Sequence, residues 1–376
     1  MSFDPTVKNA GTPRILVAPL DWGLGHATRC IPVIYELISQ GADVWIAGEG
    51  APVVLLKKEF PHLPFLPLKG YRIQYANSRI GLFWSLIRQV PSIIHTIKHE
   101  NNWLIKAVHE HGFDAVISDN RYGLYHQFIP SIFITHQLRI KSPFGRLSEL
   151  ILQKRNYKYI KKFTECWVPD IEQGDGLAGE LSHPLVKPTI PVYYTGILSR
   201  LKSLPVTTQK RHLFISLSGP EPQRSQLENL VIRDISMYNG TVTMVRGLPA
   251  TAEILPSTND LTFYNHLPAE AFSLEMQKAE YIISRSGYST IMDIMQLGKK
   301  AILIPTPGQT EQEYLGYFLE KKEYAACVRQ QNFSLDRILM KAADFKFEPP
   351  LTPANNLPAL VASLLQKIKP LSNAKT

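Results

Sequence analysis

Short, mostly apolar segments alternate with helix-patterned segments along most of this chain of 376 residues. The segment 14–19 is followed by helical spacing of apolar residues in 27–40, which stops at Gly41. Strands that are apolar throughout are typical of parallel sheets buried on both faces, so the alternation predicts an α/β fold. Further strands are predicted at 43–47, 65–68, 114–118, 131–135, 166–169, 212–217, 241–246, 261–264, 280–283, 301–304 and 325–328.

The chain is too long for one typical domain and fits two. Residues 174–191 are rich in Gly, Pro and Ser, and residues 207–210 are polar, so a domain boundary is predicted near 190–210. We expect a first domain over 1–195 and a second over 196–350. The last segment, 351–376, carries an amphipathic helix that could cross back to the first domain.

The charge and cysteine content exclude some classes of protein. The net charge is +9, and both halves share the excess, so neither half has the composition of a basic nucleic-acid domain. Three widely spaced cysteines predict reduced thiols in a cytoplasmic protein rather than a disulfide framework. No apolar run reaches the length of a membrane span, and the one after Arg14 is too short for a signal peptide.

Two small-residue turns between a strand and a helix carry the chemistry. The first is 20–26 (LDWGLGH) and the second is 284–290 (SRSGYST). The first N–H groups of a helix have no partner within it, and the helix dipole adds partial positive charge there, so such a turn suits an anion. In the second turn Arg285 adds a full charge. This combination predicts a diphosphate site.

The other polar candidates also follow predicted strands, where open parallel sheets bind their ligands. Two such domains facing each other would gather these positions around one cleft. They are Asp21 to His26, Asp119 to Arg121, His136, Ser218 and Gly219, Arg285 to Gly287, and Pro307 to Gln312.

At these residues the chain resembles glycosyltransferase family 28, and most closely its lipid-linked N-acetylglucosaminyltransferases of peptidoglycan synthesis. The resemblance is best over about 211–330, in "SRSGYSTIMDIMQLGKKAILIPTPGQTEQEYLG", and in the first half it rests on "DWGLGHATR". It implies the GT-B architecture of two facing Rossmann-like domains. It also implies an inverting, metal-independent transfer from a nucleotide sugar, with no cofactor.

The resemblance assigns the donor to the second domain. Asp293 stands where the family has a Glu that holds the ribose, and Gln312 and Glu313 stand where it has two Gln. The shorter Asp and the Gln-to-Glu change leave the sugar and the nucleotide open. The implied donor contacts are Ser218, Gly219, Arg285, Ser286, Gly287, Asp293, Gln309, Gln312 and Glu313.

The resemblance assigns the acceptor and the base to the first domain. His26 matches the family's loop His, and an imidazole can take the acceptor's proton near neutral pH. Asp21 or Asp119 could orient its ring. Asp119 and Arg121 could also simply pair with each other. The implied acceptor contacts are Gly25, Asp119, Arg121 and His136.

Other functions fit parts of the pattern. Gly23-Leu24-Gly25 with Glu49 resembles a dinucleotide fingerprint, but Thr28 replaces the third Gly and His26 would crowd the diphosphate. The interpretation we favour is transfer of a hexosyl or N-acetylhexosaminyl group from a UDP-sugar to a glycan or glycolipid of the cell envelope. The alternatives are a sugar-nucleotide 2-epimerase of GT-B fold and a non-catalytic nucleotide-sugar-binding protein.

Two segments could contact an anionic membrane surface on its cytoplasmic side. Residues 80–97 are very apolar with flanking basic residues, although for them we favour a helix packed on the first sheet. Residues 138–162 carry eight basic side chains against Glu149 alone, and Leu147, Leu150 and Ile151 recur at helical spacing. We expect these apolar residues to pack and the basic face to be exposed.

Overall fold

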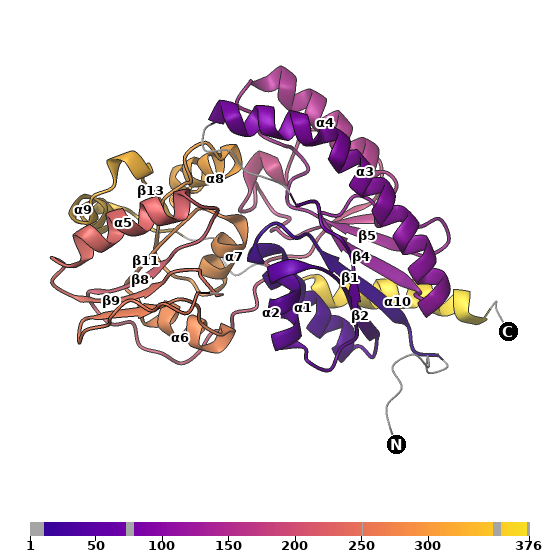
Figure 1. Cartoon of the computed structure of the whole chain (residues 1–376), viewed down its shortest axis with the longest axis horizontal. Helices are drawn as coiled ribbons and strands as arrows, with labels where there is room; N and C mark the ends of the chain where they lie inside the picture. Colours follow the sequence, from indigo (N-terminus) through magenta and orange to yellow (C-terminus); the bar gives the residue numbers. More distant parts are fainter. Residues whose placement is uncertain (1–10, 73–78, 250, 349–354, 374–376) are drawn as a thin grey trace. The chain divides into compact units, whose positions relative to one another are not determined.

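A computed structural model describes residues 11–72, 79–249, 251–348 and 355–373, apart from the side chains of 79–89 and 369–373. These residues form two compact units, one mainly of 11–198 with the C-terminal helix, the other mainly of 199–348. Each unit is built on one parallel sheet with helices packed on it, so the α/β prediction is confirmed (Figure 1).

The first unit contains a seven-stranded sheet in the order β3-β2-β1-β4-β5-β6-β7. All of its strand pairs are parallel, with Ile15 beside Val44 on one side and Ala115 on the other. Its strands are β1 (Arg14–Pro19), β2 (Asp43–Gly48), β3 (Phe65–Pro67), β4 (Ala115–Asp119), β5 (Ser131–Ile134), β6 (Glu165–Val168) and β7 (Val192–Tyr194).

The helices of the first unit cover its sheet. Leu16 and Ala18 of β1 pack with Leu104 and Ala107 of α3 on one face. Helix α10 contacts α1, and Gln40 after α1 donates a hydrogen bond to the carbonyl of Pro358 in α10. The helices are α1 (Leu24–Ser39), α2 (Gly50–Glu59), α3 (Arg79–His111), α4 (Arg146–Ile160), the short η1 (Gly179–Leu181) and α10 (Leu357–Asn373).

The second unit contains a six-stranded sheet in the order β10-β9-β8-β11-β12-β13, also parallel throughout. Its strands are β8 (His212–Ser216), β9 (Thr241–Val245), β10 (Leu261–Tyr264), β11 (Tyr281–Ser284), β12 (Ala301–Leu303) and β13 (Ala326–Cys327). Its helices are α5 (Gln223–Ile235), α6 (Ala269–Lys278), α7 (Tyr288–Gln296), α8 (Thr310–Lys321), η2 (Gln330–Asn332) and α9 (Leu335–Asp344).

The core of the second unit follows from the two-residue period of its strands. Leu213 and Ile215 of β8 pack with Val231 of α5 and Ile338 of α9 on one face. Phe214, between them in sequence, points to the other face and packs edge-on against Phe272 of α6. The sheet is therefore buried on both sides, as its continuous apolar strands predict.

Strand β7 was not predicted. It lies in the Pro-rich region where the domain boundary was expected, and it pairs with β6 at the edge of the sheet. Pro191 precedes it, a position that an edge strand tolerates because proline has no N–H to donate. Asn356, just before α10, donates its backbone N–H to the carbonyl of Thr195 directly after β7.

Candidate active site

His26 and Asp119 come from two neighbouring strands of the first sheet. His26 is the third residue of α1, which follows β1, and Asp119 ends β4. β1 and β4 pair directly, and the chain leaves them in opposite directions along the sheet, which is where open α/β sheets bind ligands. Nδ1 of His26 lies 3.2 Å from Oδ1 and 3.3 Å from Oδ2 of Asp119. Of the two acids considered as partners of the ring, the structure shows Asp119.

Arg29 completes this cluster and was not predicted. Its side chain is buried, and its Nε donates to Oδ2 of Asp119 at 2.7 Å while Nη2 contacts Oδ1. Nη2 also lies 2.6 Å from Nδ1 of His26, and Nη1 lies 3.2 Å from Nδ1 of His136. His136, a predicted acceptor contact, is only 4% exposed and thus belongs to the buried cluster.

The cluster fixes the charges of its members. Burial alone would raise the pKa of Asp119, but the charge of Arg29 and the contact with His26 outweigh it and hold that pKa at about 2. Burial and then Arg29 lower the pKa of His26 below its ordinary 6.5, although Asp119 opposes them. At neutral pH, Asp119 is therefore ionised and His26 neutral, which is the state a general base needs.

Asp21, just after β1, binds the 69–72 loop. Its carboxylate accepts the backbone N–H groups of Tyr71 and Arg72 at 3.0 and 3.1 Å. A Cβ on residue 70 would lie 2.3 Å from Cγ of Asp21, so only Gly70 fits this close approach. Asp21 is therefore a structural residue of the 69–72 loop.

Glu49 also binds the 69–72 loop. It accepts hydrogen bonds from the Gly70 N–H at 2.8 Å and from the Arg72 guanidinium at 2.7 and 2.8 Å. The hydrogen bond from Arg72 lowers the pKa of Glu49 to about 2, against an opposing effect of burial. The dinucleotide interpretation needed this carboxylate for a ribose, and here it is engaged by the protein.

Arg121 does not present its charge to an acceptor. It is fully buried, and its Nε donates to Glu100 at 2.9 Å while Nη1 and Nη2 donate to the carbonyls of Pro19 and Lys69. Both predictions for this residue, acceptor contact and pairing with Asp119, are therefore wrong. The reason is that Glu100, from α3, supplies the carboxylate that a buried guanidinium requires.

Three loops converge at the C-terminal edge of the second sheet, after β8, β11 and β12. Ser218 and Gly219 are exposed, and Gly219 has a φ of 107°, which favours glycine. A Cβ on residue 219 would lie 3.8 Å from Oγ1 of Thr306, a buried hydroxyl without a hydrogen-bond partner among the described residues. Two predicted donor contacts and one unpredicted hydroxyl thus lie together.

The start of α7 faces open space. Gly287 is its N-cap with a φ of −72°, and no side chain among the described residues caps the helix. A Cβ at this position would meet nothing within 4 Å. A helix N-terminus whose capping residue has no side chain and has space around it suits an anion.

Other predicted donor residues hold the loop after β12. The hydroxyl of Ser286 is buried and donates to the carbonyl of Gln312 at 2.8 Å. The Gln312 side chain accepts the N–H of Thr306 at 2.9 Å and donates to Oε1 of Gln309 at 2.6 Å. These side chains shape the loop, whereas the resemblance implied contact with the sugar.

The structure contradicts the role predicted for Arg285. Its side chain is buried, and it donates to the backbone carbonyls of Ile304, Pro305 and Gln223 at 3.2, 3.3 and 2.7 Å. Burial lowers the pKa of Arg285 to about 10. The guanidinium therefore ties β11 to the loop after β12 and to the start of α5, and the prediction that it meets the diphosphate is wrong.

Asp293 is half-buried on α7 and accepts a hydrogen bond from the Ser199 hydroxyl at 2.5 Å. Burial raises the pKa of Asp293 to about 6, although Ser199 and Arg200 lower it. A ribose hydroxyl would have to replace or share the bond from Ser199, so the ribose contact remains a proposal.

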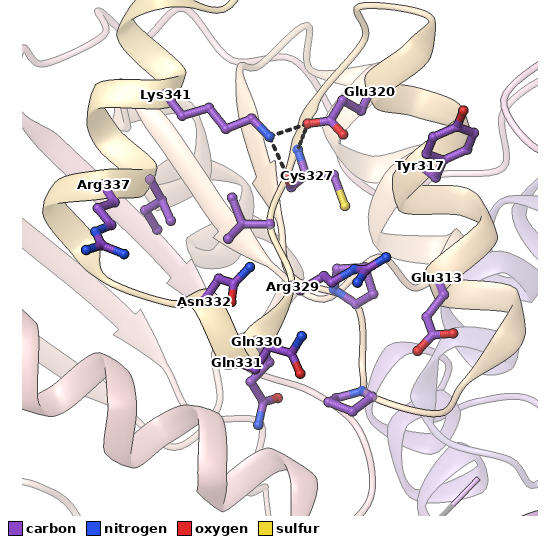
Figure 2. A pocket seen from close by; sticks show the side chains of 14 residues that line it. Glu313, Tyr317, Glu320, Cys327, Arg329, Gln330, Gln331, Asn332, Arg337 and Lys341 are labelled. Carbon is purple, nitrogen blue, oxygen red and sulfur yellow. Dashed lines mark hydrogen bonds and ion pairs between the residues drawn. The ribbon is translucent and has the colours of Figure 1, made fainter.

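A pocket of about 770 Å³ lies beside the loop after β12 (Figure 2). Glu313 lines it, and this carboxylate also accepts the N–H of Gly308 at 3.1 Å. Lys341 is held by Glu320 and by the carbonyl of Cys327. The residues that line the pocket are Pro305, Pro307, Glu313, Tyr317, Glu320, Cys327, Val328, Arg329, Gln330, Gln331, Asn332, Arg337, Ile338 and Lys341.

Helix α4 is the reverse of the amphipathic helix that was expected. Its buried face is polar: Glu149 pairs with Arg139 at 2.7 Å, and Asn156 donates to the carbonyl of Gln137 at 2.9 Å. The prediction that its apolar residues pack is wrong, because these polar groups satisfy the 137–139 segment. The exposed apolar residues, each more than half exposed, are Phe144, Leu147, Leu150 and Ile151. The other membrane candidate, 80–97, lies largely outside the described side chains.

The sequence carried one signal for the residues that were missed. Arg29 lies three positions after His26, so both share a face of α1, and a basic residue there is a natural partner of an acid on the next strand. Thr306 had no comparable signal, because its isolation depends on how the loops after β8 and β12 approach each other.

The described ranges contain no cluster of three His, Cys, Asp or Glu side chains arranged as metal ligands. Nor does any helix in them combine the length and apolar character needed to cross a bilayer. Cys30, Cys166 and Cys327 are free thiols.

Sequence relatives agree with this architecture. Residues 260–364 match the glycosyltransferase family 28 C-terminal domain. A protein of Methanosarcina acetivorans named as an uncharacterized glycosyltransferase is 23% identical over 83% of this chain and 84% of its own length. The UDP-N-acetylglucosamine--N-acetylmuramyl-(pentapeptide) pyrophosphoryl-undecaprenol N-acetylglucosamine transferase of Rickettsia massiliae is 33% identical over 84 residues, 22% of each chain.

Solved glycosyltransferase structures share the whole fold. The glycotransferase of kitacinnamycin superposes with a TM-score of 0.62 at 14% identity, covering 97% of this chain and 96% of its own. MurG of Acinetobacter baumannii superposes with a TM-score of 0.54 at 14% identity, covering 95% and 99%. The chain therefore has the GT-B fold of these glycosyltransferases, and its residues 260–364 carry the C-terminal domain of glycosyltransferase family 28.

Proposed function

We propose that this enzyme moves a hexosyl or N-acetylhexosaminyl group from a UDP-sugar to a hydroxyl of a glycan or glycolipid acceptor, with inversion and without a metal. The observation that carries the proposal is the placement of His26 Nδ1 against the ionised Asp119, which leaves Nε2 as the ring nitrogen for proton transfer when Nδ1 carries the proton. The Rickettsia relatives support the choice of donor and acceptor class, because their names specify UDP-N-acetylglucosamine and a pyrophosphoryl-undecaprenol acceptor.

In the proposed reaction the acceptor oxygen attacks the anomeric carbon from the face opposite the leaving group. The bond from that carbon to the diphosphate oxygen breaks, and the electron pair stays on the diphosphate. Nε2 of His26 takes the acceptor's proton, and ionised Asp119 stabilises the imidazolium through Nδ1–H. Gly25 and the buried His136 are proposed to shape the acceptor side.

The diphosphate is proposed to bind at the start of α7. The open N-cap at Gly287, the Gly219 turn and the Thr306 hydroxyl supply N–H and O–H donors, which do not depend on Arg285. Ser218, Gln309, Glu313 and Asp293 remain proposed sugar or nucleotide contacts.

The donor is identified by a thermal-shift panel of nucleotides and nucleotide sugars, because a ligand that binds only the folded state raises the melting temperature. UDP and UDP-sugars are expected to give the largest shifts. Incubating the identified sugar nucleotide alone, without acceptor, then tests the reaction class. Formation of a C2 epimer would contradict the transferase proposal, and tight binding without transfer to any acceptor pool would favour a non-catalytic protein.

Gly287→Asp is expected to weaken nucleotide binding at least tenfold while leaving the fold intact. Asp is a preferred N-cap residue and the site has room, so the melting temperature should stay or rise slightly. Its carboxylate would occupy the anion site, where two unit charges about 4 Å apart repel by roughly 4 kcal/mol. Isothermal titration with UDP measures the affinity.

Gly287→Ala is the matched control, because it adds a Cβ without charge at a φ that alanine adopts freely. It should bind UDP nearly as the wild type does. Equal affinity of the Asp variant and the wild type would place the diphosphate elsewhere.

We further propose that α4 contacts an anionic membrane surface on the cytoplasmic side. Four apolar side chains are exposed at its N-terminal end, and five basic residues are exposed toward its C-terminal end. Apolar groups beside Lys and Arg fit the boundary between acyl chains and anionic headgroups. The basic residues are Lys154, Arg155, Lys158, Lys161 and Lys162.

The double variant Leu147→Ser, Ile151→Ser is expected to reduce binding to phosphatidylglycerol-containing vesicles by tenfold or more, since each buried aliphatic side chain contributes about 1.5–3 kcal/mol. Co-sedimentation measures the partition, and vesicles of phosphatidylcholine alone should bind less. Leu185→Ser, at an apolar residue that is 97% exposed in another loop, is the control. Unchanged sedimentation of the double variant would remove α4 as the contact surface.

A further inference from the structure

One ring nitrogen in the first sheet's cluster has two incompatible partners. Nδ1 of His26 lies 2.6 Å from Nη2 of Arg29 and 3.2 Å from Oδ1 of Asp119. A guanidinium only donates hydrogen bonds and a carboxylate only accepts them. Nδ1 therefore accepts from Arg29 when it has no proton, and donates to Asp119 when it has one.

The two arrangements differ in what the other ring nitrogen can do. With the proton on Nδ1 and shared with Asp119, Nε2 has a free lone pair and can take a proton. With Arg29 donating to Nδ1, the neutral ring carries its proton on Nε2 and cannot act as a base there. The shorter contact, with Arg29, favours the second tautomer.

Arg29 also has an alternative acceptor. Its Nη1 lies 3.2 Å from Nδ1 of His136, while Nε stays on Oδ2 of Asp119. The Arg29 side chain is buried, and the Asp119 carboxylate that it contacts is fully buried. The same carboxylate is approached by Sγ of Cys30 at 3.7 Å. Among the described residues, the titratable and charged groups that face His26 or Asp119 are these side chains from α1, the end of β4 and the segment after β5.

We propose that Arg29 is a positioning residue for His26, whose guanidinium competes with Asp119 for Nδ1 and so decides which ring nitrogen is free to act on the acceptor. The proposal rests on His26 being the base of the proposed function. It adds that the resting enzyme holds the ring largely in the Nε2–H tautomer, and that Arg29 must yield Nδ1 to Asp119 before proton transfer.

Nitrogen-15 NMR of the histidine rings tests this without turnover, because the two tautomers have distinct ring-nitrogen shifts. Histidine-labelled protein is titrated with pH, and the His26 signals are assigned with His26→Gln. The wild type is expected to show mainly Nε2–H, with a pKa below 6.5, since burial and Arg29 lower it. In Arg29→Gln the tautomer should change to Nδ1–H, and the pKa should rise by about one unit or more once Asp119 acts unopposed.

Two further variants keep the test decisive. Arg29→Lys retains a charge beside Asp119 but loses the fork that reaches Nδ1, so the His26 ring should again change toward the Nδ1–H tautomer. This variant replaces Arg29→Gln in the test if the glutamine variant does not fold. Asp119→Asn removes the competing carboxylate, so the neutral His26 ring should be found only as the Nε2–H tautomer. A wild-type ring already in the Nδ1–H form, or one unmoved in both Arg29 variants, overturns the inference.

Activity separates this inference from the proposed function. If His26→Ala still transfers sugar while the tautomer responds to Arg29 as expected, the base assignment fails and the positioning role of Arg29 stands. If His26→Ala is inactive but the tautomer ignores Arg29, the base assignment stands and the inference fails.

Discussion

Replacing His26 with alanine is expected to slow glycosyl transfer by about 10²–10⁴-fold, the usual contribution of a general base. The nucleotide affinity should stay the same, because the proposed donor contacts lie in the second unit. The physical reason is that Asp119, with a pKa of about 2, stays ionised and stabilises a proton on the ring that alanine cannot carry. Initial rates at saturating donor, together with UDP titration, separate the two effects.

His62→Ala is the control for this substitution, since His62 is exposed in the loop after α2 and outside the cluster. It should retain wild-type rates. A His26→Ala enzyme with an unchanged rate on the true donor and acceptor would remove the base assignment.

Replacing Arg121 with alanine is expected to destabilise the first unit by about 3–5 kcal/mol, because it leaves the carboxylate of Glu100 buried without its ionic partner. Glu100 already pays a desolvation cost, as burial raises its pKa against the effects of Arg121 and Tyr71. All five tryptophans lie outside residues 199–352, so urea unfolding followed by tryptophan fluorescence reports on the first unit.

Two comparisons define this result. Arg121→Met with Glu100→Leu removes both charges and should cost much less than the single change. Arg233→Ala breaks the pair with Asp234, in which Arg233 is 60% exposed, and should cost at most about 1 kcal/mol when unfolding is followed by circular dichroism. If Arg121→Ala lowers the free energy of unfolding no more than Arg233→Ala does, the buried pair of Arg121 and Glu100 does not stabilise the first unit.

Much of the fold could be predicted from local pattern. Apolar runs such as 14–19 and 281–284 became buried parallel strands because their composition fits no half-exposed element. Strand β7 was not predicted, because three residues after Pro191 are too few to show the apolar pattern that distinguishes a strand from a Pro-rich loop.

Helix α4 shows where pattern reasoning fails. Helical spacing identifies a face but not which face is buried. The apolar face of Leu147 and Ile151 became the exposed one, because Arg139 and the carbonyl of Gln137 needed the polar partners Glu149 and Asn156. Which face of the helix is buried was settled by its hydrogen bonds to the 137–139 segment that precedes it.

The sequence by itself determined the alternation of strands and helices, and with it the edges of the two sheets at which polar residues gather. It also identified His26 and Gly287 at those edges, since backbone turns depend on neighbouring residues. The tertiary structure alone decided how the charges are used. Arg121 and Arg285 became buried partners of Glu100 and of backbone carbonyls, while Arg29 took the place beside the histidine. A charged side chain goes where its desolvation is best compensated, and the compensating groups come from segments that only folding brings together.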